Sequence, residues 1–130
     1  LPLNSPILSI ISQDKKEILT SKKEPIFSGD KPIAILINEQ TASAAEIFAG
    51  VLKHYFPEKV SLIGEKSYGK GSVQEVVEFQ EGSVLKYTIA LRNIADKEES
   101  INHEGLKPDL ILHDDPKTPE DEVLKRLGLE

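Results

Sequence analysis

An uninterrupted apolar run, IAILI at Ile33–Ile37, constrains the fold more than any other feature of the chain. Strands that are covered on both faces have runs of this kind, without alternation of polar and apolar residues, and they are typical of layered α/β domains. The next segment has helical periodicity. Its apolar residues fall on one stripe, and small residues beside it allow close packing; the stripe is Ile47, Phe48, Val51, Leu52 and Tyr55, and the small residues are Ala44, Ala45, Ala49 and Gly50. Pro57 ends this predicted helix. The pattern therefore predicts a central strand followed by a helix.

The remaining segments alternate between strand and turn patterns. We expect strands at residues 7–11, 17–20, 60–63, 73–79 and 84–91, a glycine-rich loop at residues 64–71 and a hairpin turn at residues 80–83. A last helix is expected after Thr118, with Pro119 in its first turn and Gly128 at its end. The fold class predicted is α/β.

Composition excludes several classes of protein. The 130 residues are 38% hydrophobic and 29% charged, which is typical of a folded domain, and the net charge of -6 disfavours nucleic acid as a partner. Cysteine is absent, which excludes disulfides and cysteine-ligated zinc, and no apolar run is long enough to span a membrane. Because the chain begins at Leu1, contains no methionine and shows no signal peptide, we expect it to be part of a longer or processed protein.

Ser43 lies at the start of the predicted helix, after the turn that follows the predicted strand, in the segment NEQTASAAEI at residues 38–47. One interpretation is a capping box, with Ser43 as N-cap and Glu46 three residues later. The other is a nucleophile at a helix N-terminus, where free N–H groups stabilise an oxyanion. His54 is excluded as its base because it lies about 16 Å along the same helix, and His103 and His113 are in polar stretches expected to be exposed. Local sequence leaves both interpretations open.

Lys70 lies in the glycine-rich loop, within the pattern G-x-x-x-x-G-K. A phosphate-binding loop spanning residues 64–72 is a weak alternative, because Gly71 occupies the position of the magnesium-binding hydroxyl and a strand is expected after it. A solvated lysine in a flexible turn is a second alternative. A catalytic base is the third, since a lysine that is buried can be neutral near pH 7. Gln74, four residues later, would point to the same side of an extended strand and could orient the amine.

Three ordered motifs resemble those of the carboxy-terminal processing proteases, also called tail-specific proteases. They are ILINEQTASAAEIFAG at residues 35–50, IGEKSYGKGSVQ at residues 63–74 and EGLKPD at residues 104–109. The resemblance covers residues 33–112. It implies Ser43 as nucleophile, Lys70 as general base, Gln74 as the orienting partner of the lysine and the Ala44 N–H as an oxyanion donor. It also implies no metal, no cofactor, protein or peptide C-termini as substrates, and a location outside the cytoplasm.

The resemblance further implies a crotonase/Clp-peptidase-like core of stacked strand-strand-helix units, present here as a fragment. We expect residues 1–32 to form a leading hairpin that joins to the missing upstream core, residues 33–112 to form the protease core, and residues 113–130 to form a linker and helix. The N-P-G-G segment of the family, which supplies a second oxyanion donor, and its PDZ domain are missing. The interval between Ser43 and Lys70 is slightly longer than usual, with extra residues around 56–59, and residues 93–99 lack the family's turn residues.

From these differences we expect a truncated catalytic unit that associates with itself or with the missing upstream half. Within it, Glu46 is expected to cap the helix and Asp109 to be structural. The alternative class is an inactive crotonase-like scaffold or partner-binding domain, in which Ser43 is only a cap.

Overall fold

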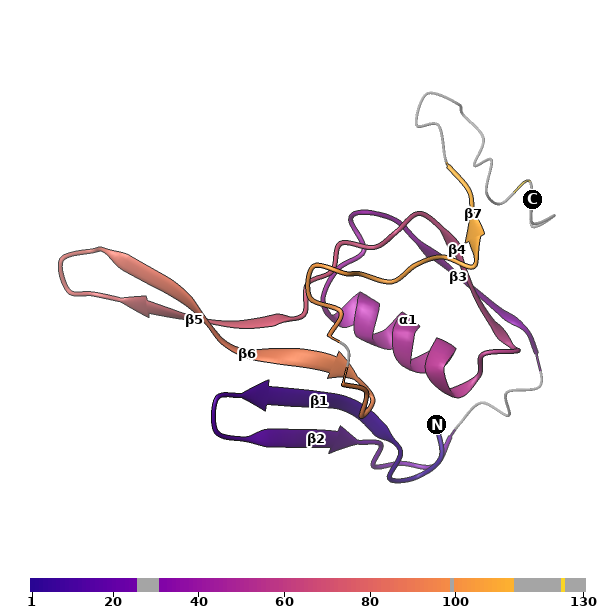
Figure 1. Ribbon diagram of the computed structural model, residues 1–130, viewed down its shortest axis with the longest axis horizontal. Helices are drawn as coiled ribbons and strands as arrows, with labels where there is room; N and C mark the ends of the chain where they lie inside the picture. Colours follow the sequence, from indigo (N-terminus) through magenta and orange to yellow (C-terminus); the bar gives the residue numbers. More distant parts are fainter. Residues whose placement is uncertain (26–30, 99, 114–124, 126–130) are drawn as a thin grey trace.

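A computed structural model describes residues 1–25, 31–98, 100–113 and 125 of the chain. Two β-sheets lie on opposite sides of one helix, α1 (Ala44–Tyr55), as Figure 1 shows. The predicted α/β class is confirmed. Among the described residues, no helix is both long and apolar enough to cross a membrane.

The parallel sheet contains β3 (Ile33–Ile37), β4 (Val60–Gly64) and β7 (Leu110–Ile111), in the order β3-β4-β7. Ile33, Ile35 and Ile37 pack toward the helix, whereas Ala34 and Leu36 are exposed. The apolar run therefore forms the predicted strand, but the expectation that it is central and covered on both faces is wrong. β3 lies at the sheet edge, and in the described part of the chain only one of its faces is covered, since Ala34 and Leu36 of the other face are exposed.

The antiparallel sheet has the order β2-β1-β6-β5, from β2 (Lys16–Thr20), β1 (Pro6–Ser12), β6 (Val84–Ile94) and β5 (Ser72–Glu78). Both predicted hairpins, β1–β2 and β5–β6, are confirmed. The β5–β6 hairpin extends as an arm away from the helix and ends in a turn where Gly82 has a φ of 88° (Figure 1). Its pairing with β1 at the other end connects the arm to the rest of the fold.

Helix α1 contributes to two hydrophobic clusters. On one side Ala49 packs with Ile37, Val60 and Leu62 of the parallel sheet, and on the other Val51 packs with residues at the end of β6. Gly50 permits the second contact, because a Cβ there would lie 2.2 Å from Ile94 Cδ1. The close packing expected of Ala49 and Gly50 is thus confirmed, whereas the same expectation is wrong for Ala44 and Ala45, which are exposed in the first turn of the helix.

Phe48 departs from the predicted apolar stripe. Its side chain is 64% exposed, and it lies outside both hydrophobic clusters of α1. The helix divides its apolar residues between two sheets, so a single stripe does not describe it. Phe48 is consequently an exposed aromatic on the helix that begins at Ser43.

The predicted C-terminal helix lies outside the described residues, except for Lys125, which is helical. The division at residues 32 and 112 stays a prediction. The segment that lacks the family's turn residues begins at residue 93, within β6. This strand ends at Ile94, and the chain turns at Ala95, which has a φ of 53°.

Candidate active site

Ser43 is the N-cap residue of α1, at the end of the turn that follows β3. Its backbone has a φ of 55° and a ψ of -115°, a region that non-glycine residues rarely occupy. Such strain persists only where surrounding contacts enforce it, and it concentrates at functional sites. Two hydrogen bonds hold the Ser43 backbone in this conformation: its carbonyl accepts the Ile47 N–H, and its own N–H donates to Glu46.

Glu46 is a fully buried carboxylate that connects the serine segment to the lysine loop. Its Oε2 accepts the Ser43 N–H at 2.8 Å and the Lys70 N–H at 2.9 Å, while its Oε1 accepts the Gly69 N–H and the Ser67 hydroxyl, each at 2.6 Å. Four donors to one carboxylate supply the hydrogen bonding that a buried charge requires. The capping contact with Ser43 is the one that the sequence predicted. The other three show that Glu46 also fixes the backbone of Lys70.

The lysine loop packs against the segment that contains EGLKPD. Ser67 exchanges hydrogen bonds with Leu106, its N–H donating to the Leu106 carbonyl and its hydroxyl accepting the Leu106 N–H. Gly105 has a φ of 64°, and a Cβ there would lie 2.4 Å from the Ser67 carbonyl oxygen. A Cβ at Gly69 would similarly approach the Gly105 nitrogen to 2.8 Å. The glycines of the two motifs therefore allow two backbone segments to approach each other closely.

Lys70 and Gln74 line one groove of about 820 Å³, together with Ala42, the residue that precedes Ser43. Both side chains are exposed, and the Lys70 ammonium makes no hydrogen bond to any described residue. The burial from which a catalytic base was argued at Lys70 is therefore not found among the described residues. A β-bulge between Val73 and Gln74 interrupts the pairing of β5 with β6 at this point. Bulges occur beside active sites, where they redirect side chains. Lys70 and Gln74 thus line one groove beside the residue that precedes Ser43, and no hydrogen bond joins Lys70 to the Ser43 hydroxyl.

Arg92 is the residue that contacts the Ser43 hydroxyl. Its Nη1 donates to Ser43 Oγ at 3.2 Å, and its backbone N–H donates to the carbonyl of Gly71 at 2.7 Å, next to Lys70. Arg92 is partly buried on β6, where it pairs with Ile10 of β1. Sequence reasoning missed this residue because 49 positions separate it from Ser43, and only the register of β6 brings it there.

Ala44 follows Ser43 as the first residue of α1 and is exposed. The first N–H groups of a helix have no partner within it, and the Ser43 N–H is already used by Glu46. The Ala44 amide is the group for which the resemblance implies the role of oxyanion donor. This role stays a prediction.

The three histidines lie away from Ser43 or at the groove rim. His54 is exposed near the end of α1, and His103 is exposed beside Lys70 in the groove wall. His113 is exposed and its ring forms a hydrogen bond with the Glu65 carboxylate. This hydrogen bond is the main cause that lowers the pKa of the Glu65 carboxyl, and a hydrogen bond with Glu39 is the second cause. The predicted exposure of His103 and His113 is confirmed.

Asp109, the last residue of EGLKPD, joins three elements. Its Oδ2 accepts the Leu62 N–H of β4 at 2.8 Å and forms an ion pair with Lys53 of α1 at 2.9 Å. The hydrogen bond from Leu62, and secondly Lys53, lowers the pKa of this carboxyl. These contacts agree with the structural role expected of Asp109.

The loop geometry disfavours phosphate binding. A strand, β5, follows the loop, at the place where a phosphate-binding loop has a helix. The amides of Gly69 and Lys70, which a phosphate would need, already donate to the Glu46 carboxylate.

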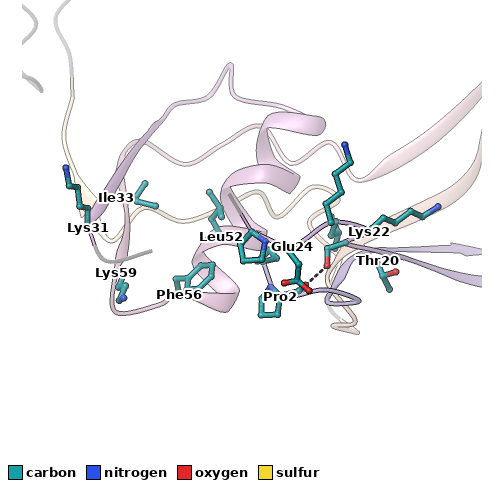
Figure 2. A pocket seen from close by; sticks show the side chains of 14 residues that line it. Pro2, Thr20, Lys22, Glu24, Lys31, Ile33, Leu52, Phe56 and Lys59 are labelled. Carbon is teal, nitrogen blue, oxygen red and sulfur yellow. Dashed lines mark hydrogen bonds between the residues drawn. The ribbon is translucent and has the colours of Figure 1, made fainter. Parts of the chain in front are cut away.

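A second cavity, of about 780 Å³, lies elsewhere in the fold and contains none of the predicted site residues. Figure 2 shows its apolar wall, with Leu52 and Phe56 from the helix and the following turn, and lysines such as Lys22 and Lys31 around it. Of the predicted site residues, Lys70 and Gln74 line the groove of about 820 Å³, and Ser43 follows Ala42 of its wall.

One signal in the sequence pointed to the wider role of Glu46. It precedes the small residues Ala49 and Gly50 by one helical turn, so it lies on the face that packs closely. A carboxylate on such a face needs several donors. For Arg92 the sequence contains no comparable signal.

Comparison with known proteins gives a consistent result. The sequence profile of peptidase family S41 matches residues 4–112. Two curated relatives are both named "Probable CtpA-like serine protease". One, from Staphylococcus epidermidis, is 39% identical over 100 residues, and the other, from Staphylococcus aureus strain N315, is 41% identical over 105 residues. These matches cover 77% and 81% of this chain and 20% of each relative, so the chain spans about a fifth of their length.

Solved structures resemble the fold as well. The photosystem II D1 C-terminal processing protease matches 87% of this chain and 28% of its own, with a TM-score of 0.71 and 31% identity. A lipoprotein from Streptococcus agalactiae matches 98% of this chain and 45% of its own, with a TM-score of 0.63 and 20% identity, a likeness of fold alone.

Proposed function

Because the chain belongs to peptidase family S41, we propose that it carries the nucleophile and the base of a serine endopeptidase with a Ser-Lys dyad. The observation that supports this most is the Glu46 carboxylate, which binds the backbones of Ser43 and Lys70 together. Burying a carboxylate costs desolvation free energy, and a helix cap does not require that the carboxylate be buried. A buried carboxylate with four donors is suited to holding two segments in a fixed relation.

In the proposed reaction, Lys70 Nζ takes the proton of Ser43 Oγ as the oxygen bonds to the scissile carbonyl carbon. The Ala44 N–H stabilises the resulting oxyanion. The C–N bond then breaks, and the leaving amine takes the proton from Lys70. Water, deprotonated by Lys70, hydrolyses the acyl-enzyme, which releases a new carboxylate and restores Ser43. Gln74 orients the lysine without adding a charge.

The substrates proposed are unfolded or tagged proteins cut near their C-termini, in a compartment outside the cytoplasm. This rests on the resemblance to C-terminal processing proteases, one of which, the photosystem II D1 enzyme, is similar in fold over most of the chain. No metal or cofactor takes part in the proposed reaction.

The chain is proposed to be one part of the catalytic unit, since it spans about a fifth of its curated relatives. Exposed apolar residues support this. Leu36 of β3 is 46% exposed and Ile111 of β7 is 66% exposed, on the sheet that α1 covers from one side. We expect the rest of the protease, or a second copy of the chain, to cover such surfaces. The isolated 130 residues should cleave an unstructured peptide negligibly and should self-associate.

The test is peptide hydrolysis by the complete protease chain that carries this segment. Ser43→Ala and Lys70→Ala should each abolish turnover and leave the fold intact. Lys70→Arg should also fail, because a guanidinium stays protonated and cannot act as a base. Substantial turnover by Lys70→Ala at neutral pH would contradict the assignment of the base.

An inactive scaffold is the second candidate. It is favoured by one observation, that Ser43 Oγ contacts Arg92 and not Lys70. Wild-type turnover that depends on both Ser43 and Lys70 excludes this candidate.

A further inference from the structure

Arg92 contacts the oxygen atom that would perform the nucleophilic attack. We propose that its guanidinium positions Ser43 Oγ and stabilises the negative charge that develops on this oxygen. This inference rests on the proposed function and adds to it a third participant besides Lys70 and the Ala44 amide.

The first argument is the direction of the hydrogen bond. A hydroxyl has one proton to donate and two lone pairs that accept, whereas a guanidinium only donates. The contact from Arg92 Nη1 at 3.2 Å therefore occupies a lone pair of Ser43 Oγ and leaves the hydroxyl proton available. Because arginine stays protonated, Arg92 cannot take this proton itself. It complements a base and does not replace one.

The second argument is charge. As the proton leaves Ser43, its oxygen becomes negative, and a hydrogen bond from a cation strengthens. Among the described residues, no carboxylate forms an ion pair with Arg92. The Glu46 carboxylate, on the backbone side of Ser43, is engaged by four donors. The charge of Arg92 is consequently directed at the hydroxyl.

The third argument is rigidity. Arg92 belongs to β6, which pairs with β1 on one side and β5 on the other, and its N–H is bound to the Gly71 carbonyl. The guanidinium thus extends from a backbone that is connected to both the sheet and the lysine loop. Preorganised donors of this kind cost no reorganisation at the moment of reaction.

In acylation, the Oγ–C bond forms while the proton passes to Lys70, and Arg92 stabilises the oxygen during the transfer. In deacylation, the same Oγ–C bond breaks and the oxygen again carries negative charge until it regains a proton from Lys70. Arg92 acts in both half-reactions and is unchanged by them. The contact should therefore affect kcat more than KM.

The experiment uses the complete protease chain and a fluorophosphonate probe, which reacts with an activated serine, with the adduct mapped by mass spectrometry. Arg92→Gln should slow phosphonylation of Ser43 by about 10- to 100-fold, the range for a hydrogen bond to a charged group. Arg92→Lys should recover part of the rate because it keeps the charge. Lys97→Gln removes the same charge from an exposed position beyond β6 and should react at the wild-type rate.

Chemical rescue separates this role from a structural one. Millimolar guanidinium added to Arg92→Ala should accelerate labelling of Ser43, while sodium chloride at equal ionic strength should not. Labelling of Arg92→Gln within twofold of wild type, or faster than wild type, would overturn the inference while the Ser43 nucleophile stands. If wild type is not labelled at Ser43, the proposed function fails and the inference fails with it.

Discussion

Ser43 and Lys70 donate their backbone N–H groups to the same oxygen, Oε2 of Glu46. One buried carboxylate therefore sets the relative position of two segments that are far apart in the sequence. This relationship determines how the site is expected to respond to mutation.

Glu46→Gln should weaken the hydrogen bonds that hold the lysine loop. A glutamine amide has one accepting oxygen, and its NH₂ group would face the N–H and O–H donors that surround Glu46. Hydrogen bonds to a charged group contribute about 1.5–3 kcal/mol, and a loss of that size is expected. Hydrogen–deuterium exchange should show faster exchange at the amides of Gly69 and Lys70. Glu58→Gln, at an exposed position after α1, is the matched control and should leave both amides protected. Unchanged protection in Glu46→Gln would contradict the account.

The outline of the fold could be predicted from the sequence because local patterns specify it. The alternation and turn residues of both hairpins, and the apolar run of β3, gave the correct elements. The environment of β3 could not be predicted. An apolar run indicates that a strand is buried, but it does not indicate which segments pack on each of its two faces. The single apolar stripe predicted to include Phe48 fails for a similar reason, because the sequence does not show that α1 contacts two sheets.

Among the contacts of Ser43, local sequence predicted only the one with a residue close to it along the chain. Ser43 and Glu46 are three positions apart and form a recognisable cap. Arg92 reaches Ser43 through the pairing of β6 with β1 and β5, which depends on long-range register. Such tertiary contacts have no signature in a single sequence.

Gly105→Ala should destabilise the protein more than Gly82→Ala. Both glycines have positive φ, so alanine costs about 1–2 kcal/mol of backbone strain at either position. At Gly105 the added Cβ would also lie 2.4 Å from the Ser67 carbonyl oxygen, whereas nothing lies within 4 Å at Gly82. Thermal unfolding of the two variants compares the two costs directly. Equal losses would mean that the EGLKPD segment does not pack on the lysine loop as described.

The Asp109 carboxyl predicts an acid-dependent contribution to stability. Its pKa is lowered in the folded state by the Leu62 N–H and by Lys53, so the stabilisation is present above the unfolded pKa and is lost as pH falls through the folded pKa. The side chain is 41% exposed, and solvent screening limits the ion pair with Lys53 to about 0.2–1 kcal/mol. Asp109→Asn should therefore be less stable than wild type at pH 7, and the difference should shrink below about pH 4. Urea unfolding at several pH values provides the measurement, and a difference that grows toward low pH would have the wrong sign.

Nucleotide should not bind the loop at residues 64–72. The amides of Gly69 and Lys70 are occupied by Glu46, and β5 follows the loop where a phosphate-binding loop has a helix. Calorimetric titration with ATP and magnesium should give no heat of binding. Micromolar affinity that disappears in Lys70→Ala would restore the phosphate-loop interpretation.

The central claim is that Ser43 forms an acyl-enzyme with Lys70 as its base. The most direct measurement is rapid quenching of the complete protease chain with a peptide or activated ester substrate, followed by mass spectrometry of the adduct. The account predicts an acyl group on Ser43 within the first turnover, absent from Ser43→Ala and strongly reduced in Lys70→Ala. Hydrolysis without any adduct on Ser43, or an adduct that forms equally fast in Lys70→Ala, would contradict it.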